Sequence, residues 1–500
     1  MVIPSSLFSL ENLYRAYRQC RRRKRSTHNA LAFESDLEGN LIQLHQDLLD
    51  KSYQPGKSMV FLLEKPKRRE IFAAEFRDRI VHHVLVAHLE PKWERRFIAD
   101  SYACRKGKGT HRGVRRLQQF TRQITENQTS PAWYLQLDVR GFFISINRHI
   151  LFDRLTAREH DPDVLWLLRL FVYYDPVREC RFRSSDREDF LRLPAHKTLF
   201  KAEPDCGLPI GNLTSQFFAN VYLDALDQFV KHELKARHYV RYCDDFVLMS
   251  QSRDELVGWY SAIQAFLETR LRLQLNGKSR LQPIGNGIDF LGYVVRPWYL
   301  LIRRRVVNAL HERLSRASGQ LARQGLEVGE CTRGRKVYPY PWELLEKIRA
   351  WLTSYHGHFY HALSEQPWLK HVARHAWLKE YFRTDGNRFV HRLPELCHVR
   401  SVFQQRRWFQ KLLPNHVLMI QFGPCWELTG QQVHSAPWSF WFDKRLSGET
   451  LKKVAFWLWK SGVLVAWIGE TGTSVTTVRE RKVMERWEGT HHAFLQEVTG

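Results

Sequence analysis

The chain has 500 residues, enough for about three domains, and its 77 Lys and Arg against 52 Asp and Glu give a formal net charge of +25. This charge favours a polyanionic partner, because each neutralised phosphate releases condensed counterions. No apolar run approaches the ~18 residues of a membrane span, and no signal-peptide pattern opens the chain, so we expect a cytoplasmic protein that does not use a membrane.

The first sixty residues are predicted to form a helical extension. Leucines and tyrosines recur at helical spacing over residues 8–52, which indicates two amphipathic helices. Between them, residues 21–25 read Arg-Arg-Arg-Lys-Arg. This run is equally consistent with a solvated charge cluster and with a contact to a nucleic-acid backbone.

Two basic loops follow. Residues 61–71 read as a strand interrupted by a turn that carries Lys67 and Arg69, and residues 101–111 form a glycine-rich loop that carries Arg105. A guanidinium can hold phosphate oxygens in a bidentate manner, and glycine lets the backbone approach a phosphate closely. The second loop is not a Walker loop, since the preceding Gly is absent from the required position.

An apolar strand over residues 133–138 ends in Asp138, and Phe143 follows five residues later. Residues 239–249 predict a tight hairpin with Asp244 and Asp245 at its tip. By itself an Asp-Asp pair also suits a plain surface turn. If the fold brought Asp138 beside it, the carboxylates could share two Mg²⁺ ions, which suits in-line phosphoryl transfer.

Three later segments complete the pattern. Residues 206–216 predict a turn that feeds a helix and carry Ile210, Gly211 and Gln216, and Lys278 follows the hairpin. Residues 288–295 alternate as a strand pair does, and residues 300–385 are basic and helical. After residue 400, tryptophans and alternating apolar runs predict a small α/β domain. The eight Cys lack Cys-x-x-Cys spacing, which argues against a zinc site or a disulfide scaffold.

In this order, the acid at a strand end, the glycine turn before a helix and the Tyr-x-Asp-Asp hairpin resemble the palm of a reverse transcriptase, over about residues 10 to 380. The resemblance implies an α+β fold, the right-hand polymerase with fingers, palm and helical thumb, plus a small C-terminal α/β domain. The expected boundaries are residues 1–60 for the extension, 61–295 for fingers and palm, 296–390 for the thumb and 400–500 for the last domain.

The resemblance also implies roles for single residues. Two Mg²⁺ ions, or Mn²⁺, would be held at Asp138, Val139, Asp244 and Asp245. Lys278 would lie near the departing pyrophosphate. Lys67, Arg69 and Arg105 would contact the triphosphate or template, and Phe143 would abut the sugar, although Phe143 also suits a core position. The implied partners are template RNA, the cDNA/RNA heteroduplex, dNTPs and an accessory protein of a retroelement.

Ile210 and Gln216 narrow the resemblance. Most reverse transcriptases place Gln before the second glycine and end the motif with Ser-Pro, whereas residues 210–216 read Ile-Gly-Asn-Leu-Thr-Ser-Gln. This pattern is similar to the enzymes of diversity-generating retroelements, which misincorporate opposite template adenines, although it could also be neutral variation within a lineage. A defence or retron reverse transcriptase is the alternative of the same class, and a non-catalytic RNA-binding protein is the alternative of another class. A group II intron enzyme is expected less, because its Gln-Gly motif and an HNH pattern are absent.

Two runs after residue 400 loosely resemble the mismatch-binding domain of MutS repair proteins, namely residues 417–428 and 463–472. That family wedges an aromatic side chain into the duplex, but Cys425 occupies the corresponding position. Glu427 is retained, and Trp426 is the nearest aromatic residue. We therefore expect docking of nucleic acid or of a partner there, without intercalation at a mismatch.

Overall fold

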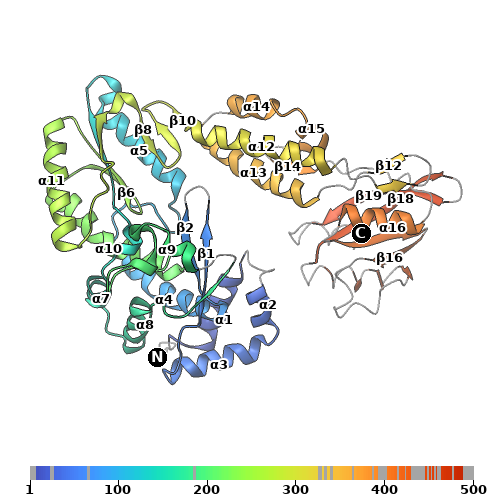
Figure 1. Cartoon of the computed structure of the whole chain (residues 1–500), viewed down its shortest axis with the longest axis horizontal. Coiled ribbons are helices and arrows are strands. Elements are labelled where there is room, and N and C mark those ends of the chain that lie inside the picture. Colours follow the sequence, from blue (N-terminus) through green and yellow to red (C-terminus); the bar gives the residue numbers. More distant parts are fainter. Residues whose placement is uncertain are drawn as a thin grey trace, which may run out of the picture. The chain divides into compact units, whose positions relative to one another are not determined.

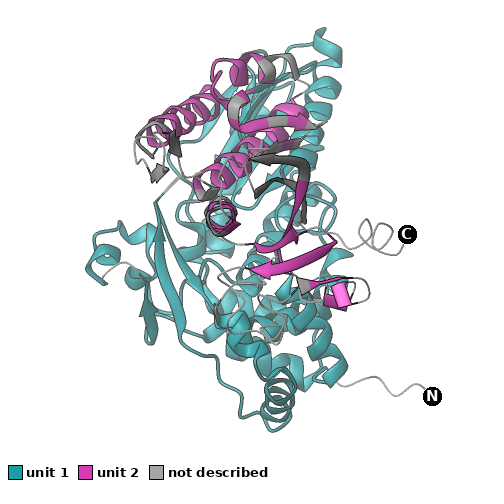
Figure 2. Cartoon of the chain, turned by 90° about the vertical axis from the view of Figure 1, so that its right-hand side faces the viewer, with its two compact units in different colours: residues 1–301 teal, residues 302–500 magenta. Residues whose placement is uncertain are grey.

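The computed structural model, drawn in Figure 1, describes residues 7–487 with gaps. The gaps are residues 23–27, 65–67, 184–186, 325–328, 332–334, 338–341, 363–364, 386–387, 392–401, 414–415, 423, 430–444, 448–449, 452, 455–457, 459–462 and 476–477. The chain divides into two compact units, residues 1–301 and 302–500, which Figure 2 colours separately. Each unit is described by itself.

Unit 1 begins with three helices where the sequence predicted two. They are α1 (Leu10–Arg21), α2 (His28–Glu34) and α3 (Leu37–Leu49). The break before α3 arises because the Asp36 carboxylate caps the backbone N–H of Gly39, which starts a new helix. Buried side chains of these helices belong to the same hydrophobic cluster as the central sheet, so the N-terminal helices share its core.

The remaining elements of unit 1 alternate between helices and short strands. The strands are β1 (Ser58–Leu63), β2 (Arg69–Ala73), β3 (Trp133–Asp138), β4 (Cys180–Phe182), β5 (His238–Tyr242), β6 (Asp245–Ser250), β7 (Arg280–Pro283), β8 (Ile288–Phe290), β9 (Tyr293–Val295) and β10 (Leu300–Ile302). The helices are α4 (Phe76–Glu94), α5 (Thr110–Ile124), α6 (Phe142–Ser145), α7 (Arg148–Thr156), α8 (Pro162–Tyr173), α9 (Arg187–Leu191), α10 (Leu213–Gln228) and α11 (Arg253–Arg270).

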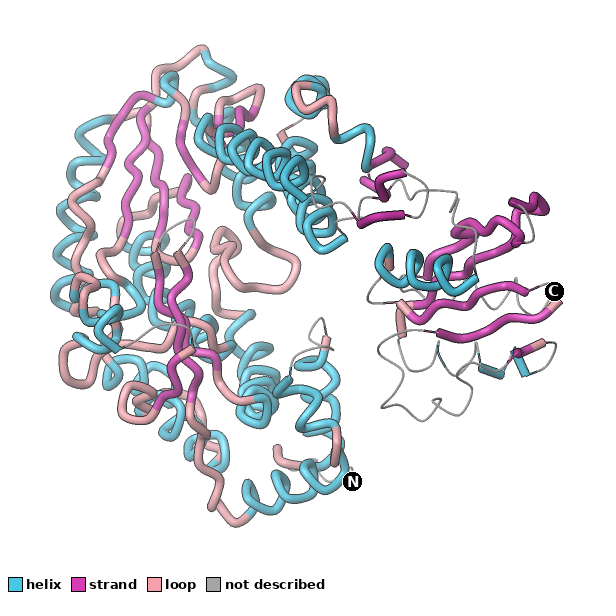
Figure 3. The backbone as a smooth tube through the Cα atoms, turned by 45° about the vertical axis from the view of Figure 1, so that its right-hand side comes forward, coloured by secondary structure: helices cyan, strands magenta, loops and turns pink. Residues whose placement is uncertain are grey.

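The central sheet of unit 1 has the strand order β5-β6-β3-β7, and all of its neighbouring strands are antiparallel. Figure 3 shows these strands side by side with helices alongside them. Helix α5 packs against β5, and α11 packs against β3 and β6. Helix α10 is buried on most of its sides, and its buried side chains include polar and charged residues as well as apolar ones.

Two smaller sheets complete unit 1. One has the order β2-β1-β4, with β1 and β2 antiparallel and β1 and β4 parallel. The other has the order β10-β9-β8, in which β8 and β9 form the hairpin that the alternation of residues 288–295 predicted. Leu291 and Gly292 both have positive φ in its turn, with values of 50° and 96°.

Unit 2 contains a helical cluster and a sheet. The helices are α12 (Arg304–Gln324), α13 (Trp342–His361), α14 (Glu365–Ala373) and α15 (Leu378–Tyr381), followed by α16 (Val402–Leu412). The strands are β11 (Gly329–Cys331), β12 (Arg335–Val337), β13 (Phe382–Asp385), β14 (Arg388–His391), β15 (Val417–Phe422), β16 (Cys425–Thr429), β17 (Arg445–Leu446), β18 (Val465–Val475) and β19 (Val478–Trp487).

The last part of unit 2 is a five-stranded sheet in the order β17-β16-β15-β18-β19, with β15 and β18 parallel. Its buried residues form clusters apart from the cluster of α12 to β14. The separate domain predicted after residue 400 stays a prediction, because the two compact units divide at residues 301 and 302. No helix among the residues that the structure describes is long and apolar enough to cross a membrane.

Candidate active site

The hairpin of β5 and β6 places Asp244 at the tip of a buried ribbon. Tyr242 pairs with Asp245, so Cys243 and Asp244 alone form the turn, and Cys243 accommodates it with a φ of 56°. Strand β3 runs antiparallel to β6 in a register that sets Asp138 opposite Asp245. The fold therefore brings Asp138 to Asp244 and Asp245, from which the sequence separates it by more than a hundred residues.

Neighbouring amides orient these acids. The Asn276 side chain donates from Nδ2 to Oδ2 of Asp138 at 3.0 Å, and its backbone N–H donates to the Asp138 carbonyl at 2.7 Å. The Gln136 side chain donates from Nε2 to Oδ1 of Asp245 at 3.0 Å. The backbone N–H of Val139 donates to the carbonyl of Asp244 at 3.3 Å, which joins the end of β3 to the hairpin turn. The amides fix the carboxylates without neutralising them.

The electrostatics of the site favour a cation. Burial raises the pKa of Asp244, the negative charge of Asp138 raises it further, and Arg69 is a charge that lowers it. Two anions held this close are stabilised by a positive ion between them. Among the described residues no group of three or more His, Cys, Asp and Glu is arranged to hold a metal ion unaided. The pair Asp138 and Asp244 suits Mg²⁺, which takes one or two carboxylates and completes its shell with water and substrate phosphates.

A buried ion pair holds the hairpin in place. The Arg241 guanidinium is fully buried and donates from Nε and Nη2 to the two oxygens of Asp227 on α10, at 2.7 and 2.6 Å. The Tyr239 hydroxyl donates to the same carboxylate at 2.8 Å. Nη1 of Arg241 donates to the carbonyl of Cys243 at 3.1 Å, so the ion pair reaches the turn that carries Asp244.

The loop before α10 lies against β2. The backbone N–H of Phe72 donates to the carbonyl of Ile210 at 2.8 Å. Gly211 has a φ of 129°, and a Cβ at this position would lie 2.4 Å from the Phe72 carbonyl oxygen, so only glycine fits. The Ile210 side chain is half-buried, whereas Gln216 is exposed on the first turns of α10.

The other predicted site residues are placed as follows. Arg69 is exposed at the start of β2, and Lys278 is exposed in the turn two residues after Asn276. Phe143 is half-buried against the core, with its ring 5.4 Å from that of Phe142. Lys67 lies outside the described residues. The environment of Phe143 is thus compatible with a contact to the sugar of a nucleotide and with a position in the core.

Arg105 requires a correction, because the protein itself engages its guanidinium. Nε and Nη2 donate to the Glu94 carboxylate, at 2.9 and 2.8 Å for the shortest bond of each. Nη1 donates to the carbonyls of Ile98 and Ser101 at 2.7 and 2.9 Å, and the side chain is 5% exposed. This arrangement argues against the expected contact with substrate and gives Arg105 the role of closing the loop after α4.

Glu427 is engaged in a similar way in unit 2. It is buried and forms an ion pair with Arg406 of α16. Trp426 packs edge-on against Trp467 of β18, with ring centroids 5.0 Å apart. These contacts are internal to unit 2, and the expectation that this sheet does not intercalate at a mismatch stays a prediction.

Sequence reasoning missed Asn276, Gln136 and the pair of Arg241 and Asp227. Only Arg241 carried a signal, because a charge within the apolar strand of residues 238–242 must find a buried partner. The amides carry no such signal, since their partners lie 109 and 138 residues away in sequence.

Comparison with known proteins adds evidence that is independent of this geometry. Residues 57–295 match the family model described as Reverse transcriptase (RNA-dependent DNA polymerase), a span that contains Asp138, Asp244 and Asp245. Protein YkfC of Escherichia coli (strain K12) is 23% identical over 325 residues, which cover 58% of this chain and 80% of YkfC. Group II intron-encoded protein LtrA of Lactococcus lactis subsp. cremoris is 20% identical over 325 residues, which cover 52% of this chain and 50% of LtrA.

Two further relatives extend the comparison. Nuclear intron maturase 2, mitochondrial, of Arabidopsis thaliana is 29% identical over 239 residues, covering 39% of this chain and 31% of its own length. Among solved structures, telomerase from Candida albicans with a fragment of telomeric RNA has a TM-score of 0.37 at 10% identity, covering 70% of this chain and 61% of the other. The chain thus spans most of YkfC but half or less of LtrA and the maturase.

The family match coincides with the helix-flanked antiparallel sheet and with the acids at its strand ends. Residues 57–295 of this chain are therefore a reverse transcriptase domain with the right-hand polymerase fold.

Proposed function

We propose that this protein copies a template RNA into cDNA by two-metal nucleotidyl transfer. The observation that carries the proposal is the juxtaposition of Asp138 and Asp244 at adjacent strand ends, where burial and the charge of Asp138 both raise the pKa of Asp244 and a bound cation would be favourable. The match of residues 57–295 to the reverse transcriptase family supports the same reaction.

Asp138 and Asp244 would hold Mg²⁺ or Mn²⁺, with the backbone of Val139 beside them. When bound, the ions lower the pKa of the attacking hydroxyl and stabilise the charge on the leaving oxygen. Asn276 and Gln136 keep the carboxylates of Asp138 and Asp245 in one orientation. These bonds pre-organise the site, so the acids need not rearrange during the reaction.

The cations around the acids suit a triphosphate. Arg69 lies close enough to Asp244 to lower its pKa, so its guanidinium can contact the phosphates of a nucleotide held there. Lys278 is exposed beside Asn276 and would stabilise the departing pyrophosphate. Phe143 would meet the sugar, and Lys67 would join Arg69 at the phosphates. Template RNA, the cDNA/RNA heteroduplex and dNTPs are the corresponding partners.

The finer proposal is adenine-directed error, as in diversity-generating retroelements. Ile210 is fixed through its backbone by Phe72, and its half-buried side chain offers shape without a directional hydrogen bond. A lost neutral hydrogen bond changes selectivity by roughly two- to tenfold. An accessory protein of the element would then be a further partner.

A second candidate is copying of the type carried out by group II intron enzymes. It is favoured by the names of the relatives, which include an intron-encoded protein and an intron maturase. A role in defence or in a retron is a third candidate, and it would use the same reaction. For the sheet of residues 417–487 we propose docking of nucleic acid or of a partner protein, supported by its separate core.

Primer extension on a defined RNA tests the reaction. Asp244→Asn should abolish dNTP incorporation and leave RNA binding largely intact, because one metal ligand is lost and the fold is not. Asp50→Asn is the matched control, since Asp50 is exposed at the end of α3. Near-normal extension by pure Asp244→Asn protein would reject the catalytic assignment and leave an RNA-binding protein on a polymerase fold.

Sequencing of the cDNA separates the subtypes. The wild-type enzyme should misincorporate mainly opposite template adenine, and Ile210→Gln should restore part of the fidelity. Errors spread evenly over the four template bases, with no change in Ile210→Gln, would remove the diversity-generating assignment and leave the intron-type candidate.

A further inference from the structure

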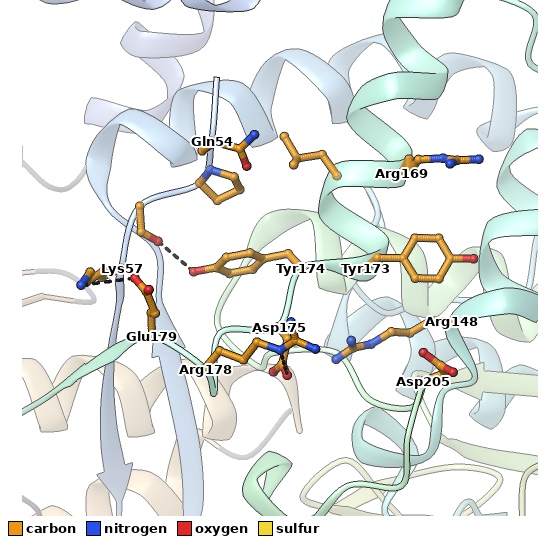
Figure 4. A pocket seen from close by; sticks show the side chains of 13 residues that line it. Gln54, Lys57, Arg148, Arg169, Tyr173, Tyr174, Asp175, Arg178, Glu179 and Asp205 are labelled. Atoms are coloured by element: carbon orange, nitrogen blue, oxygen red, sulfur yellow. Dashed lines mark hydrogen bonds and ion pairs between the residues drawn. The ribbon is translucent and has the colours of Figure 1, made fainter. Parts of the chain in front are cut away.

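Unit 1 contains a pocket of about 670 Å³ that involves none of the acids or cations of the active site. Figure 4 shows it between the segment before β1, the C-terminal end of α8 and the start of α7. Its volume lies in the range of sites that bind a small molecule, about 300–1,000 Å³. Charged side chains and two adjacent tyrosines, Tyr173 and Tyr174, line it.

Arg148 is the central residue of the pocket. It is 8% exposed, and its Nε donates to the carbonyl of Gly207 at 3.0 Å. Among the described residues no acceptor is hydrogen-bonded to its two terminal nitrogens, which face the pocket in Figure 4. Neither nitrogen is among the fully buried polar atoms of the described residues that lack a partner, so both reach the open space of the pocket, where an anion could accept their hydrogen bonds.

A second guanidinium points toward the first. Figure 4 shows the side chains of Arg178 and Arg148 extending toward one another across the pocket. Burial lowers the pKa of Arg148, the nearby carboxylates of Asp175 and Asp205 raise it, and the positive charge of Arg178 lowers it to a smaller extent. Arg178 is 84% exposed, so water screens its charge, and an anion placed between the two guanidiniums could accept hydrogen bonds from both.

The acids of the pocket compensate part of this positive charge. Asp175 accepts the backbone N–H of Val177 at 3.1 Å, and its second oxygen lies 3.5 Å from Nε of Arg178. Glu179 forms an ion pair with Lys57 at 3.2 Å. Asp205 lies 3.4 Å from His149, outside the gap between the guanidiniums. With four Lys and Arg against three Asp and Glu, the lining keeps one positive charge in excess.

We propose that this pocket binds a nucleoside monophosphate unit, whose phosphate is held between Arg148 and Arg178. A phosphate alone would leave most of the volume empty, whereas the rings of Tyr173 and Tyr174 line the same cavity and offer apolar faces for a sugar and base. The unit is either a free nucleotide or the 5′-terminal nucleotide of an RNA. Both sources present the same phosphate monoester to the arginines.

The pocket adjoins the nucleotide-facing loop without belonging to the catalytic machinery. The carbonyl that Arg148 holds is that of Gly207, and the loop continues from there to Ile210 and Gly211. A ligand on Arg148 would therefore strengthen one anchor of that loop.

Calorimetric titration of the full chain in EDTA tests the proposal, since chelation removes the ions that the polymerase site needs. AMP should bind at one site per chain, more tightly than inorganic phosphate, and adenosine should not bind. Arg178→Gln should weaken AMP binding by roughly tenfold or more, as expected for a charged hydrogen bond. Arg178 is 84% exposed, so this variant folds normally, and the exposed Arg158→Gln is the matched control.

The outcomes separate the possibilities. A trinucleotide with a 5′-phosphate that binds more tightly than AMP assigns the site to an RNA end, and the reverse order assigns it to free nucleotide. Equal affinity for AMP and inorganic phosphate would overturn the nucleotide assignment, and absence of saturable binding, or an unchanged affinity in Arg178→Gln, would overturn the site. Asp244→Asn should bind AMP like the wild type, so the result does not depend on the polymerase reaction.

Discussion

Replacing Asp227 by Asn should destabilise unit 1 far more than any exposed substitution. The change leaves the Arg241 guanidinium, which is 0% exposed, without a compensating negative charge. Asn can keep one acceptor near Nε or Nη2 but not both, and the bonds of 2.7 and 2.6 Å cannot both persist. Breaking a buried pair on one side costs about 3–5 kcal/mol, a large part of the ~5–15 kcal/mol that stabilises a domain.

Urea titration combined with hydrogen exchange measures this loss. A chain of 500 residues with two units is not expected to unfold in one step, so amide protection of residues 238–250 reports on the hairpin directly. Asp50→Asn is the control and should stay within about 0.5 kcal/mol of the wild type. Primer extension should fall in Asp227→Asn, because Arg241 also holds the carbonyl of Cys243.

A double variant makes the reasoning refutable. Asp227→Leu with Arg241→Met removes both charges and should be more stable than Asp227→Asn, since an apolar pair of similar volume replaces a buried ion pair at little cost. It should not recover activity, because the bond to Cys243 is gone. If the double variant is less stable than the single one, or if Asp227→Asn costs under about 1 kcal/mol, the ion pair does not hold the hairpin as argued.

Three further predictions follow from other features. Gly211→Ala should reduce primer extension strongly and lower the free energy of unfolding by about 1–3 kcal/mol, because its Cβ would lie 2.4 Å from the Phe72 carbonyl oxygen. Gly277→Ala is the control and should be tolerated, because the space around Gly277 is open. Equal effects of the two substitutions in extension and melting assays would contradict this prediction. Burial lowers the pKa of His82 to about 3. As pH falls, His82 therefore binds a proton in the unfolded state at a higher pH than in the folded state, so the free energy of unfolding decreases as pH falls below about 6.5. His82→Leu should flatten the pH dependence of the free energy of unfolding in urea between about pH 6.5 and 4. An unchanged slope would show that His82 does not cause this pH dependence. RNA affinity should fall steeply between about 50 and 200 mM salt, in filter-binding titrations, and a flat titration would exclude multiple phosphate contacts.

The sequence predicted the acids of the site because strand patterns are local. Asp138, Asp244 and Asp245 each follow or end an apolar run, and the register of β3 on β6 aligned them as expected. The groups that hold the acids were not predictable, because Asn276 and Gln136 are ordinary polar residues whose partners are set by strand pairing across the fold.

Arg105 shows what the composition of a loop does not predict. Its glycine-rich loop has the composition of a phosphate site, yet Glu94 at the end of α4 and two carbonyls occupy the guanidinium. Eleven residues separate Arg105 from Glu94, and whether they meet depends on where α4 ends and how the loop turns back. Composition alone does not predict how the loop turns back toward the end of α4. The same holds for residues 8–52, where hydrophobic spacing predicted helices but not the break that the Asp36 cap imposes.

The bond between the Phe72 N–H and the Ile210 carbonyl has a mechanical consequence. Strand β2 carries Arg69 at one end and this bond near the other, so its backbone connects the segment that we propose to hold the triphosphate with the loop that we propose to meet the base pair. If a nucleotide displaced β2 as it entered, this backbone bond would transmit the displacement to residue 210. Substitutions in β2 that never touch the template should therefore alter the error spectrum as well as the rate.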